Sequence, residues 1–280
     1  MHIQWYPGHM TKTRRMMQAN LSLVDMVIEL LDARVPYSSK NPDMDELARH
    51  KRRLILLNKA DLANPSATKA WEAFYQEKGF HTVALNTLEG KAASKLYDAT
   101  RHIMAEKIAK EKARGRLQVL VRAMVVGIPN VGKSTFINKL AGGAPALAAD
   151  RPGVTRGKQW IKVKSDFDVL DTPGVLWPKF EDQDVAKRLA YTGAITDPIL
   201  DTITLSEHLA EWFANHQPGA LRARYRIPTE DLPPRVLLEA IGAARGFKIK
   251  GGEIDLPRTA ATLLDEFRGG KLGRVTLEMP

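Results

Sequence analysis

Residues 127–134 form the stretch Gly-Ile-Pro-Asn-Val-Gly-Lys-Ser, and its spacing of glycines, lysine and serine is typical of a phosphate-binding loop. An apolar run over 123–126 precedes it, and helix-forming residues follow it. Glycine lets backbone N–H groups close around phosphate oxygens at a helix N-terminus, where the helix dipole favours anions. Lys133 is suited to neutralise the β- and γ-phosphates, and Ser134 can hold Mg²⁺ through its hydroxyl. The stretch therefore predicts a nucleoside triphosphate site.

A second polar group follows the apolar run 54–57, and it consists of Asn58, Lys59, Ala60 and Asp61. Guanine presents N1–H and N2–H₂ side by side, and the carboxylate of Asp61 can accept from both. Adenine lacks these donors, so it would leave the carboxylate unpaired. Asn58 suits the O6/N7 side of the base, and the stem of Lys59 can lie along the base plane. Such residues also form turns, but their position after a strand favours guanine binding.

A third group, Asp171-Thr172-Pro173-Gly174, follows the apolar run 167–170. Asp171 can hold Mg²⁺ through a water molecule, and the Gly174 N–H can meet the γ-phosphate. Between this group and the phosphate loop, Thr155 is suited to complete the magnesium shell. Each motif alone could be a Pro/Gly connector. Four elements with compatible roles together predict a magnesium-dependent GTPase.

Short apolar runs alternate with helical stretches before residue 180, which is typical of a doubly wound α/β fold. Continuous rather than alternating apolar runs indicate strands covered on both faces, and hence a parallel sheet between helices. We expect strands over 24–31, 53–57, 81–85 and 123–126, with a hairpin over 160–164 and 167–170 closing one edge. We expect helices over 67–77, 91–112 and 134–140.

After residue 180 the pattern changes to helices separated by Pro and Gly. Apolar residues recur at helical spacing in three stretches, which predicts three core-facing stripes. The stripes are Leu205, Leu209, Trp212 and Phe213; Val236, Leu237, Ala240, Ile241 and Ala244; and Ala260, Leu263, Leu264 and Phe267. The sequence thus predicts a domain over 1–179 and a small all-helical domain over 180–280.

Composition excludes several classes of protein. Of the 280 residues, 44% are hydrophobic and 26% charged, which indicates a globular rather than a disordered chain. The absence of cysteine excludes disulfides, thiolate metal sites and a cysteine nucleophile. No apolar run is long enough to span a membrane, and the start does not resemble a signal peptide. We therefore expect a cytoplasmic protein with no membrane partner.

The net charge of +10 is unevenly distributed. Residues 1–180 contain 29 basic and 17 acidic residues, a balance of +12, whereas the rest contains 13 and 15, a balance of −2. Such a field predicts a polyanionic partner such as RNA, although a basic helix face can also serve solubility alone. The segment 101–122 is the most basic, with Arg101, Lys107, Lys110, Lys112, Arg114, Arg116 and Arg122 against Glu106 and Glu111.

The order of the motifs is unusual, because the base-recognition residues precede the phosphate loop. A site depends on positions in space, so it survives when the old termini are joined and the chain is opened elsewhere. Together with residues 5–10, 32–36 and 171–180, this order resembles the ribosome biogenesis GTPase A family of bacterial factors that act late in large-subunit assembly. The resemblance covers essentially the whole chain. It implies a circularly permuted Ras-like P-loop GTPase domain followed by a small helical domain.

The resemblance implies further site residues. Asn86 and Thr87 would contact guanine through their backbone, Thr135 would contact the α-phosphate, and the loop residues Asn130, Val131 and Gly132 would bind GTP with Lys133 and Ser134. Val175 stands where many GTPases have a catalytic glutamine, so slow unassisted hydrolysis is expected. His9 is the family's candidate for positioning the attacking water, although it could simply pack in the fold. A potassium ion on Asn130 is a second candidate.

The resemblance also implies partners. We expect the chain to bind GTP and GDP, to dock on the large (50S) ribosomal subunit and its rRNA, and to be stimulated by that subunit. Off the ribosome we expect a monomer. One alternative is a nucleotide-gated RNA-binding scaffold with negligible turnover. A GTPase of tRNA modification or signalling is disfavoured by the permuted order.

Overall fold

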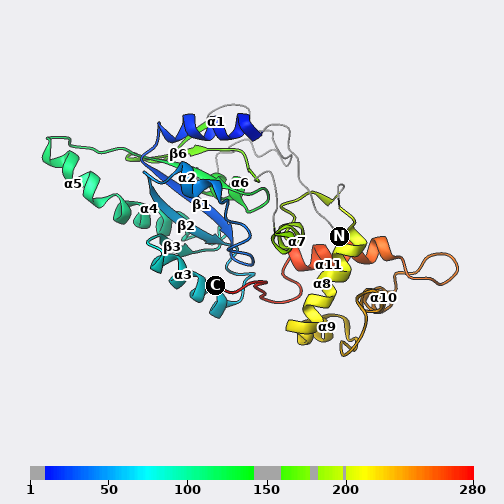
Figure 1. The fold of residues 1–280 in the computed structure, drawn as a ribbon. Coiled ribbons are helices and arrows are strands. Elements are labelled where there is room, and N and C mark those ends of the chain that lie inside the picture. The colour runs from blue at the N-terminus through cyan, green and yellow to red at the C-terminus, as the bar shows by residue number, and fades with distance from the viewer. Residues whose placement is uncertain (1–9, 142–158, 177–181, 198–199) are drawn as a thin grey trace. The chain divides into compact units, whose positions relative to one another are not determined.

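The computed structural model describes residues 10–141, 159–176, 182–197 and 200–280 (Figure 1). These residues divide into two compact units. The first, here the sheet unit, contains 10–176 together with Thr276–Pro280. The second, here the helical unit, runs from 182 to Val275. The sequence predicted one boundary between 179 and 180, so the return of the last five residues to the sheet unit is an addition to that prediction.

The sheet unit is built on six strands in the order β3-β2-β1-β4-β6-β5. Neighbouring strands are parallel except for β5 and β6, which form the predicted antiparallel hairpin at one edge. The predicted mostly parallel α/β fold is therefore confirmed. The strands are β1 (Met26–Asp32), β2 (Arg52–Asn58), β3 (His81–Ala84), β4 (Val121–Gly127), β5 (Gln159–Lys164) and β6 (Phe167–Asp171).

The register of the parallel strands brings the three motifs to one edge of the sheet. Asp32, the last residue of β1, pairs with Asn58 at the end of β2. Leu30 pairs with Gly127 at the end of β4, and Val125 pairs with Asp171 at the end of β6. Because the carboxyl ends of parallel strands lie on the same edge, the loops that follow them form one contiguous surface.

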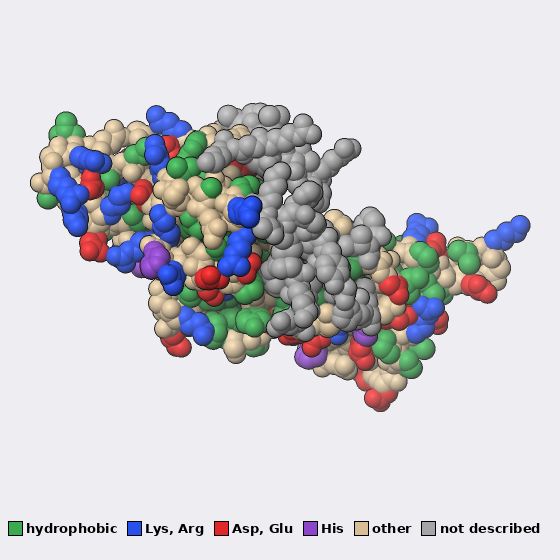
Figure 2. Space-filling model, turned by 45° about the horizontal axis from the view of Figure 1, so that its top comes forward, with side chains coloured by type: hydrophobic (Ala, Val, Ile, Leu, Met, Phe, Trp, Pro, Cys, Tyr) green, Lys and Arg blue, Asp and Glu red, His purple; other side chains and the backbone are tan. Residues whose placement is uncertain are grey.

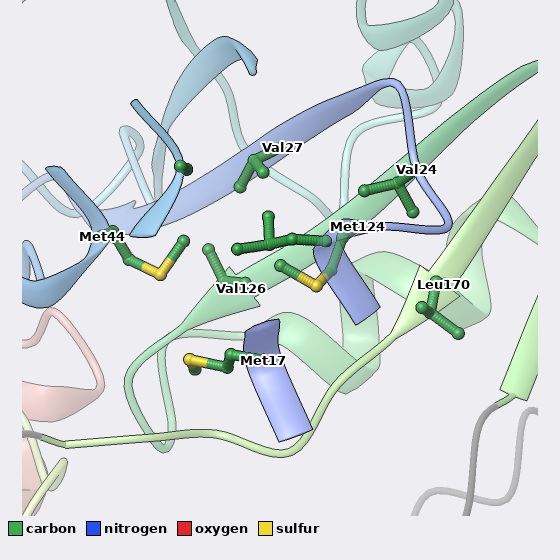
Figure 3. Packing of buried hydrophobic residues seen from close by; sticks show 9 residues of the cluster. Met17, Val24, Val27, Met44, Met124, Val126 and Leu170 are labelled. Carbon is green, nitrogen blue, oxygen red and sulfur yellow. The ribbon is translucent and has the colours of Figure 1, made fainter. Parts of the chain in front are cut away.

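Helices cover both faces of the sheet. Side chains of β1 and β4 pack against Met17 of α1 (Met10–Leu21) and Met44 of α2 (Asp43–Leu47) (Figure 3). Further along the same face, Trp71 of α3 (Pro65–Glu77) packs on β1 and β2. Side chains of the opposite parity, such as Ile28 and Leu54, are fully buried as well. Burial on both faces therefore explains why these strands are apolar at most positions along their length.

One predicted helix is two in the structure. The segment 91–112 was expected to be continuous, but it forms α4 (Ala92–Ile103) and α5 (Ala105–Ala113). Met104 separates them with a ψ of 5°, outside the helical range. Ile103 and Met104 are both buried at the break, so the turn keeps the apolar residues of both helices inside. The helices predicted at 67–77 and 134–140 are confirmed as α3 and α6 (Lys133–Leu140).

The helical unit contains five described helices. No described helix of either unit is long and apolar enough to cross a membrane. The predicted stripe over 260–267 is buried in full. Trp212 is only partly buried, unlike Leu205, Leu209 and Phe213 in the same predicted stripe. The helices are α7 (Gln183–Tyr191), α8 (Thr202–His216), α9 (Pro218–Tyr225), α10 (Pro234–Ala244) and α11 (Leu256–Arg268).

The stripe predicted for α10 was partly wrong. Val236 is 40% exposed, and Ala244 is exposed, while Leu238 and Gly242 are buried beside Leu237 and Ile241. A Cβ on Gly242 would lie 2.4 Å from Cγ2 of Ile254. The glycine lets the chain approach closely on that side, so the buried face is rotated toward it.

Candidate nucleotide-binding site

The base-recognition loop and the phosphate loop are joined directly by the amide side chain of Asn58. This side chain is buried, and its Nδ2 donates to the carbonyl of Val131 at 2.8 Å. Its Oδ1 accepts from the N–H of Thr87 at 3.2 Å and from the Thr87 hydroxyl at 2.5 Å. Asn58 thus holds the loop that contains Val131 and the loop that contains Thr87. A direct contact between Asn58 and O6 or N7 of guanine stays a prediction.

Lys59 forms a second connection between the two loops. Its Nζ donates to the carbonyl of Asn130 at 2.8 Å and to Oδ2 of Asp32 at 3.0 Å. Lys59 and Asn130 both have positive φ angles, 58° and 57°, a region that non-glycine residues adopt at some cost. Residues held in such conformations are concentrated at functional sites. The hydrogen bond therefore connects two strained positions, one in each loop.

The remaining predicted base-side residues lie in the same loops. The N–H of Ala60 donates to the carbonyl of Leu85 at 3.2 Å, which holds the loop after β2 against the loop after β3. Asn86 accepts from the N–H of Leu88 at 2.9 Å and closes a tight turn. Asp61 is exposed, so its carboxylate is accessible to a ligand.

Two glycines allow these loops to pack so closely. Gly132 has a φ of +95°, and a Cβ at this position would lie 2.5 Å from Nδ2 of Asn58. A Cβ on Gly174 would lie 3.0 Å from Cα of Pro129. The backbone of the phosphate loop therefore lies close to the side chain of Asn58 at Gly132, and close to the backbone of the segment after β6 at Pro129.

The phosphate side of the site has an uncompensated cation. Lys133 begins α6 and is only 9% exposed. Burial lowers the pKa of Lys133 to about 8, although the nearby Asp171 acts in the opposite direction. Within the described part of the chain, Lys133 forms no ion pair, and the neighbouring Ser134 and Thr135 are exposed on the first turn of α6. Phosphate oxygens would supply the anions that this position lacks.

Asp171 shows the opposite deficiency. Burial raises the pKa of its carboxyl, opposed by Lys133 and by the N–H of Thr172. Its Oδ1 is buried and has no hydrogen-bond partner among the described residues. Thr172 anchors the strand end by donating to the carbonyl of Val125 at 2.6 Å. A carboxylate oxygen held in this way fits the shell of a hard cation such as Mg²⁺.

Two predicted residues, His9 and Thr155, lie outside the described residues. Gly174 and Val175 follow Asp171, and the N–H of Val175 donates to the carbonyl of Gly127 at 3.1 Å. The Val175 side chain packs against the buried cluster that contains Met17.

The sequence assigned no chemical role to Asp32 and Arg34, which form a buried ion pair next to Lys59. Arg34 is 1% exposed, and its Nε and Nη2 donate to the two carboxylate oxygens of Asp32 at 2.9 and 2.8 Å. Burial would raise the pKa of Asp32, but Arg34 and Lys59 together hold it well below its usual range. A polar pair directly after the apolar run ending at Leu31 was the available signal.

Known proteins match the whole chain. Ribosome biogenesis GTPase A of Bacillus cereus is 48% identical over 282 residues, covering 100% of this chain and 95% of that protein. The chain belongs to the ribosome biogenesis GTPase A family. The protein of the same name from Thermotoga maritima is 31% identical and covers 99% of the chain and 95% of its own length. A family model described as a 50S ribosome-binding GTPase matches residues 122–217.

Solved structures support the membership of this family. A GDP-bound YlqF structure matches with a TM-score of 0.69 and 29% identity, over 95% of this chain and 99% of the other. A GNP-bound YlqF structure from T. maritima matches with a TM-score of 0.66 and 27% identity, over 96% and 98%. The family and the GTPase fold predicted from the sequence are therefore confirmed for this member of the ribosome biogenesis GTPase A family.

Proposed function

We propose that this chain binds an immature large (50S) ribosomal subunit in its GTP form and leaves it after GTP hydrolysis that the subunit stimulates. The observation that carries the proposal is the convergence of the two loops, through Asn58 on Val131 and Lys59 on Asn130. These bonds hold the loop that we propose to select guanine beside the loop that carries the buried cation of Lys133. Both GDP-bound and GNP-bound structures are known for YlqF proteins, which supports nucleotide exchange at this site.

The residues of the phosphate side are suited to hold magnesium with the nucleotide. Ser134 on α6 and Asp171, acting through water, would contact the ion, with Thr155 as the third expected ligand. The ion would neutralise charge on the β- and γ-phosphates. Lys133 would act on the same phosphates from the N-terminus of α6.

Hydrolysis requires a group that orients water, and Val175 cannot supply one. Its side chain is apolar and packs against the core, which supports slow turnover by the chain alone. We propose His9 or a potassium ion on Asn130 as the group that orients the attacking water when the subunit is bound.

If His9 has this role, His9→Ala should lower stimulated turnover and leave GTP affinity nearly unchanged. Loss of both together would indicate that His9 only packs in the fold.

The ribosomal partner is supported by the basic surface of the sheet unit. Figure 2 shows Lys and Arg side chains gathered over the end of this unit at the left of the view. Within α5, Lys110 and Lys112 are exposed and form no ion pair with the described residues, whereas Lys107 pairs with Asp25. Unpaired lysines of this kind are suited to the phosphates of rRNA. The bacterial relatives support action in the cytoplasm. We also propose that the chain is a monomer off the ribosome.

The proposal is tested by GTPase rate and co-sedimentation, each measured with purified immature large subunits. We expect a low intrinsic rate that rises several-fold with subunits, and co-sedimentation with a GTP analogue but not with GDP. Equal, near-zero rates with and without subunits, combined with GTP-dependent co-sedimentation, would instead support the RNA-binding scaffold.

Asp61→Asn tests the base site, because it should shift preference from guanine toward xanthine. Unchanged GTP affinity in that variant would remove Asp61 from the site.

A further inference from the structure

The last residues of the chain form a strap across the loops that follow β1 and β2. The strap, defined here as Thr276–Glu278, is mostly buried, with Thr276 at 8% and Leu277 at 5% exposure. Leu277 donates its N–H to the carbonyl of Arg34 at 2.8 Å. The strap therefore contacts Arg34, the residue whose side chain pairs with Asp32.

The strap touches both of these loops. The hydroxyl of Thr276 accepts from the N–H of Asn64 at 3.1 Å and donates to the carbonyl of Ala33 at 3.3 Å. Asn64 follows the base-recognition residues closely and caps α3. The strap thus connects the loop after β1 with the loop that carries Lys59 and Asp61.

Glu278 fixes the far end of the strap. Its carboxylate accepts from the N–H and the hydroxyl of Ser38, at 2.9 and 2.6 Å, and its carbonyl accepts from Nε1 of Trp71 at 3.0 Å. Ser38 and Trp71 are themselves buried. The strap is therefore tied at three successive residues to the part of the sheet unit that surrounds the base loop.

From the strap, a continuous chain of bonds leads to the phosphate loop. Arg34 receives the strap on its carbonyl, while its N–H, at 3.1 Å, and its guanidinium donate to Asp32. Asp32 accepts from Lys59, and Lys59 donates to the carbonyl of Asn130. The steps from Arg34 to Asp32 and from Asp32 to Lys59 are hydrogen bonds between buried or partly buried groups, which are the ones worth most, and the last step to Asn130 is exposed.

We propose that the strap positions Lys59 for guanine-nucleotide binding, through Arg34 and Asp32, so that Thr276, Leu277 and Glu278 are positioning residues of a site far from them in sequence. The inference rests on the proposed nucleotide site. Because the strap directly follows Val275, the last residue of the helical unit, it also gives that unit a covalent connection to the base side of the site.

The test compares two truncations of the full chain by titration with fluorescent GDP and GTP analogues. Ending the chain after Val275 removes the strap and should weaken both affinities about tenfold, the effect of one or two lost hydrogen bonds. Ending it after Glu278 removes only the exposed Met279 and Pro280 and should leave both affinities unchanged. Thr276→Val, which keeps the shape and loses both hydroxyl bonds, should weaken binding about threefold and serves if the larger truncation fails to fold.

A double-mutant cycle separates positioning from general support of the fold. In a Lys59→Ala background the chain of hydrogen bonds from the strap has no lysine left to position. Removing the strap should therefore cause less than a twofold further loss of affinity. The full tenfold loss in that background, or equal affinities for the truncated and full chains, would overturn the inference. A full-length chain that binds no guanine nucleotide would overturn the proposed function, and the role of the strap with it.

Discussion

Two aspartates end parallel strands of the same sheet and illustrate two ways of satisfying a buried carboxylate. On the base side, Asp32 is surrounded by Arg34 and Lys59, which hold its pKa well below its usual range in spite of burial. On the phosphate side, burial raises the pKa of Asp171, and one of its oxygens has no partner among the described residues. The base side is thus completed by the chain itself, whereas the proposed role of the phosphate side leaves its completion to a ligand.

This difference separates folding from binding within one site. Groups already paired in the protein contribute to the free energy of unfolding, because removal of one partner leaves a buried charge behind. Groups left unpaired cost stability until a ligand arrives, and then contribute to affinity. Substitutions on the two sides should therefore be distinguishable by which of the two quantities they change.

The largest effect is expected for Arg34→Met on the base side. The change leaves the buried Asp32 with Lys59 alone, so the free energy of unfolding should fall by about 3–5 kcal/mol in urea titration. Arg116→Met removes an exposed arginine, with a side chain 68% accessible, and should change stability by less than about 0.5 kcal/mol. Similar losses in the two variants would contradict the role given to the buried pair.

Lys133→Met should have the reverse effect on the phosphate side. GTP affinity should fall about 100-fold, because a buried charged donor to the phosphates is lost. The free energy of unfolding should rise by about 1 kcal/mol, because an unpaired buried ammonium is replaced by an apolar chain of similar length. Fluorescent-GTP titration and urea unfolding measure the two quantities. A variant that is less stable than the parent would show that Lys133 is satisfied before nucleotide binds.

Gly132→Ala tests the contact between the two sides. The added Cβ would meet Nδ2 of Asn58, at a φ that strains any side chain, so we expect a loss of about 2 kcal/mol in stability. GTP affinity should fall by about tenfold, because the loops must separate. Gly90→Ala is the matched control, since a Cβ there meets nothing within 4 Å and its φ is not positive. If both variants bind GTP like the parent, the close packing of the loops is not required.

The smallest effect concerns acid pH, where the two aspartates should act with opposite signs. The folded pKa of Asp32 is lowered, so its contribution to stability is present above the unfolded value of about 3.8 and is lost as pH falls below it. The folded pKa of Asp171 is raised above that value, so its burial cost is relieved earlier, as pH falls through the raised pKa. Urea unfolding between pH 6 and pH 3 should therefore show a shallower loss in Asp32→Asn and a steeper loss in Asp171→Asn. Parallel profiles would contradict the assignment.

Much of the sheet unit could be predicted because its strands are continuous apolar runs that end in polar motifs. The convergence of Asn58 and Asp171 on one edge followed from strand direction alone. The break at Met104 could not be predicted, because the spacing of apolar residues is nearly the same in two consecutive helices as in one continuous helix. The buried face of α10 depends on how closely Ile254 approaches Gly242, which is a tertiary contact. The pairing of Arg34 with Leu277 joins residues too distant in sequence for any local pattern.

The return of Thr276–Pro280 has a topological consequence. The helical unit is attached to the sheet unit through both of its ends, so it is an insertion within one fold rather than an appended tail. A version of the sheet unit that stops near residue 176 would lack a piece of its own interior. To obtain that unit alone, the excised helices should be replaced by a flexible linker that rejoins the terminal segment, as in the removal of an inserted domain.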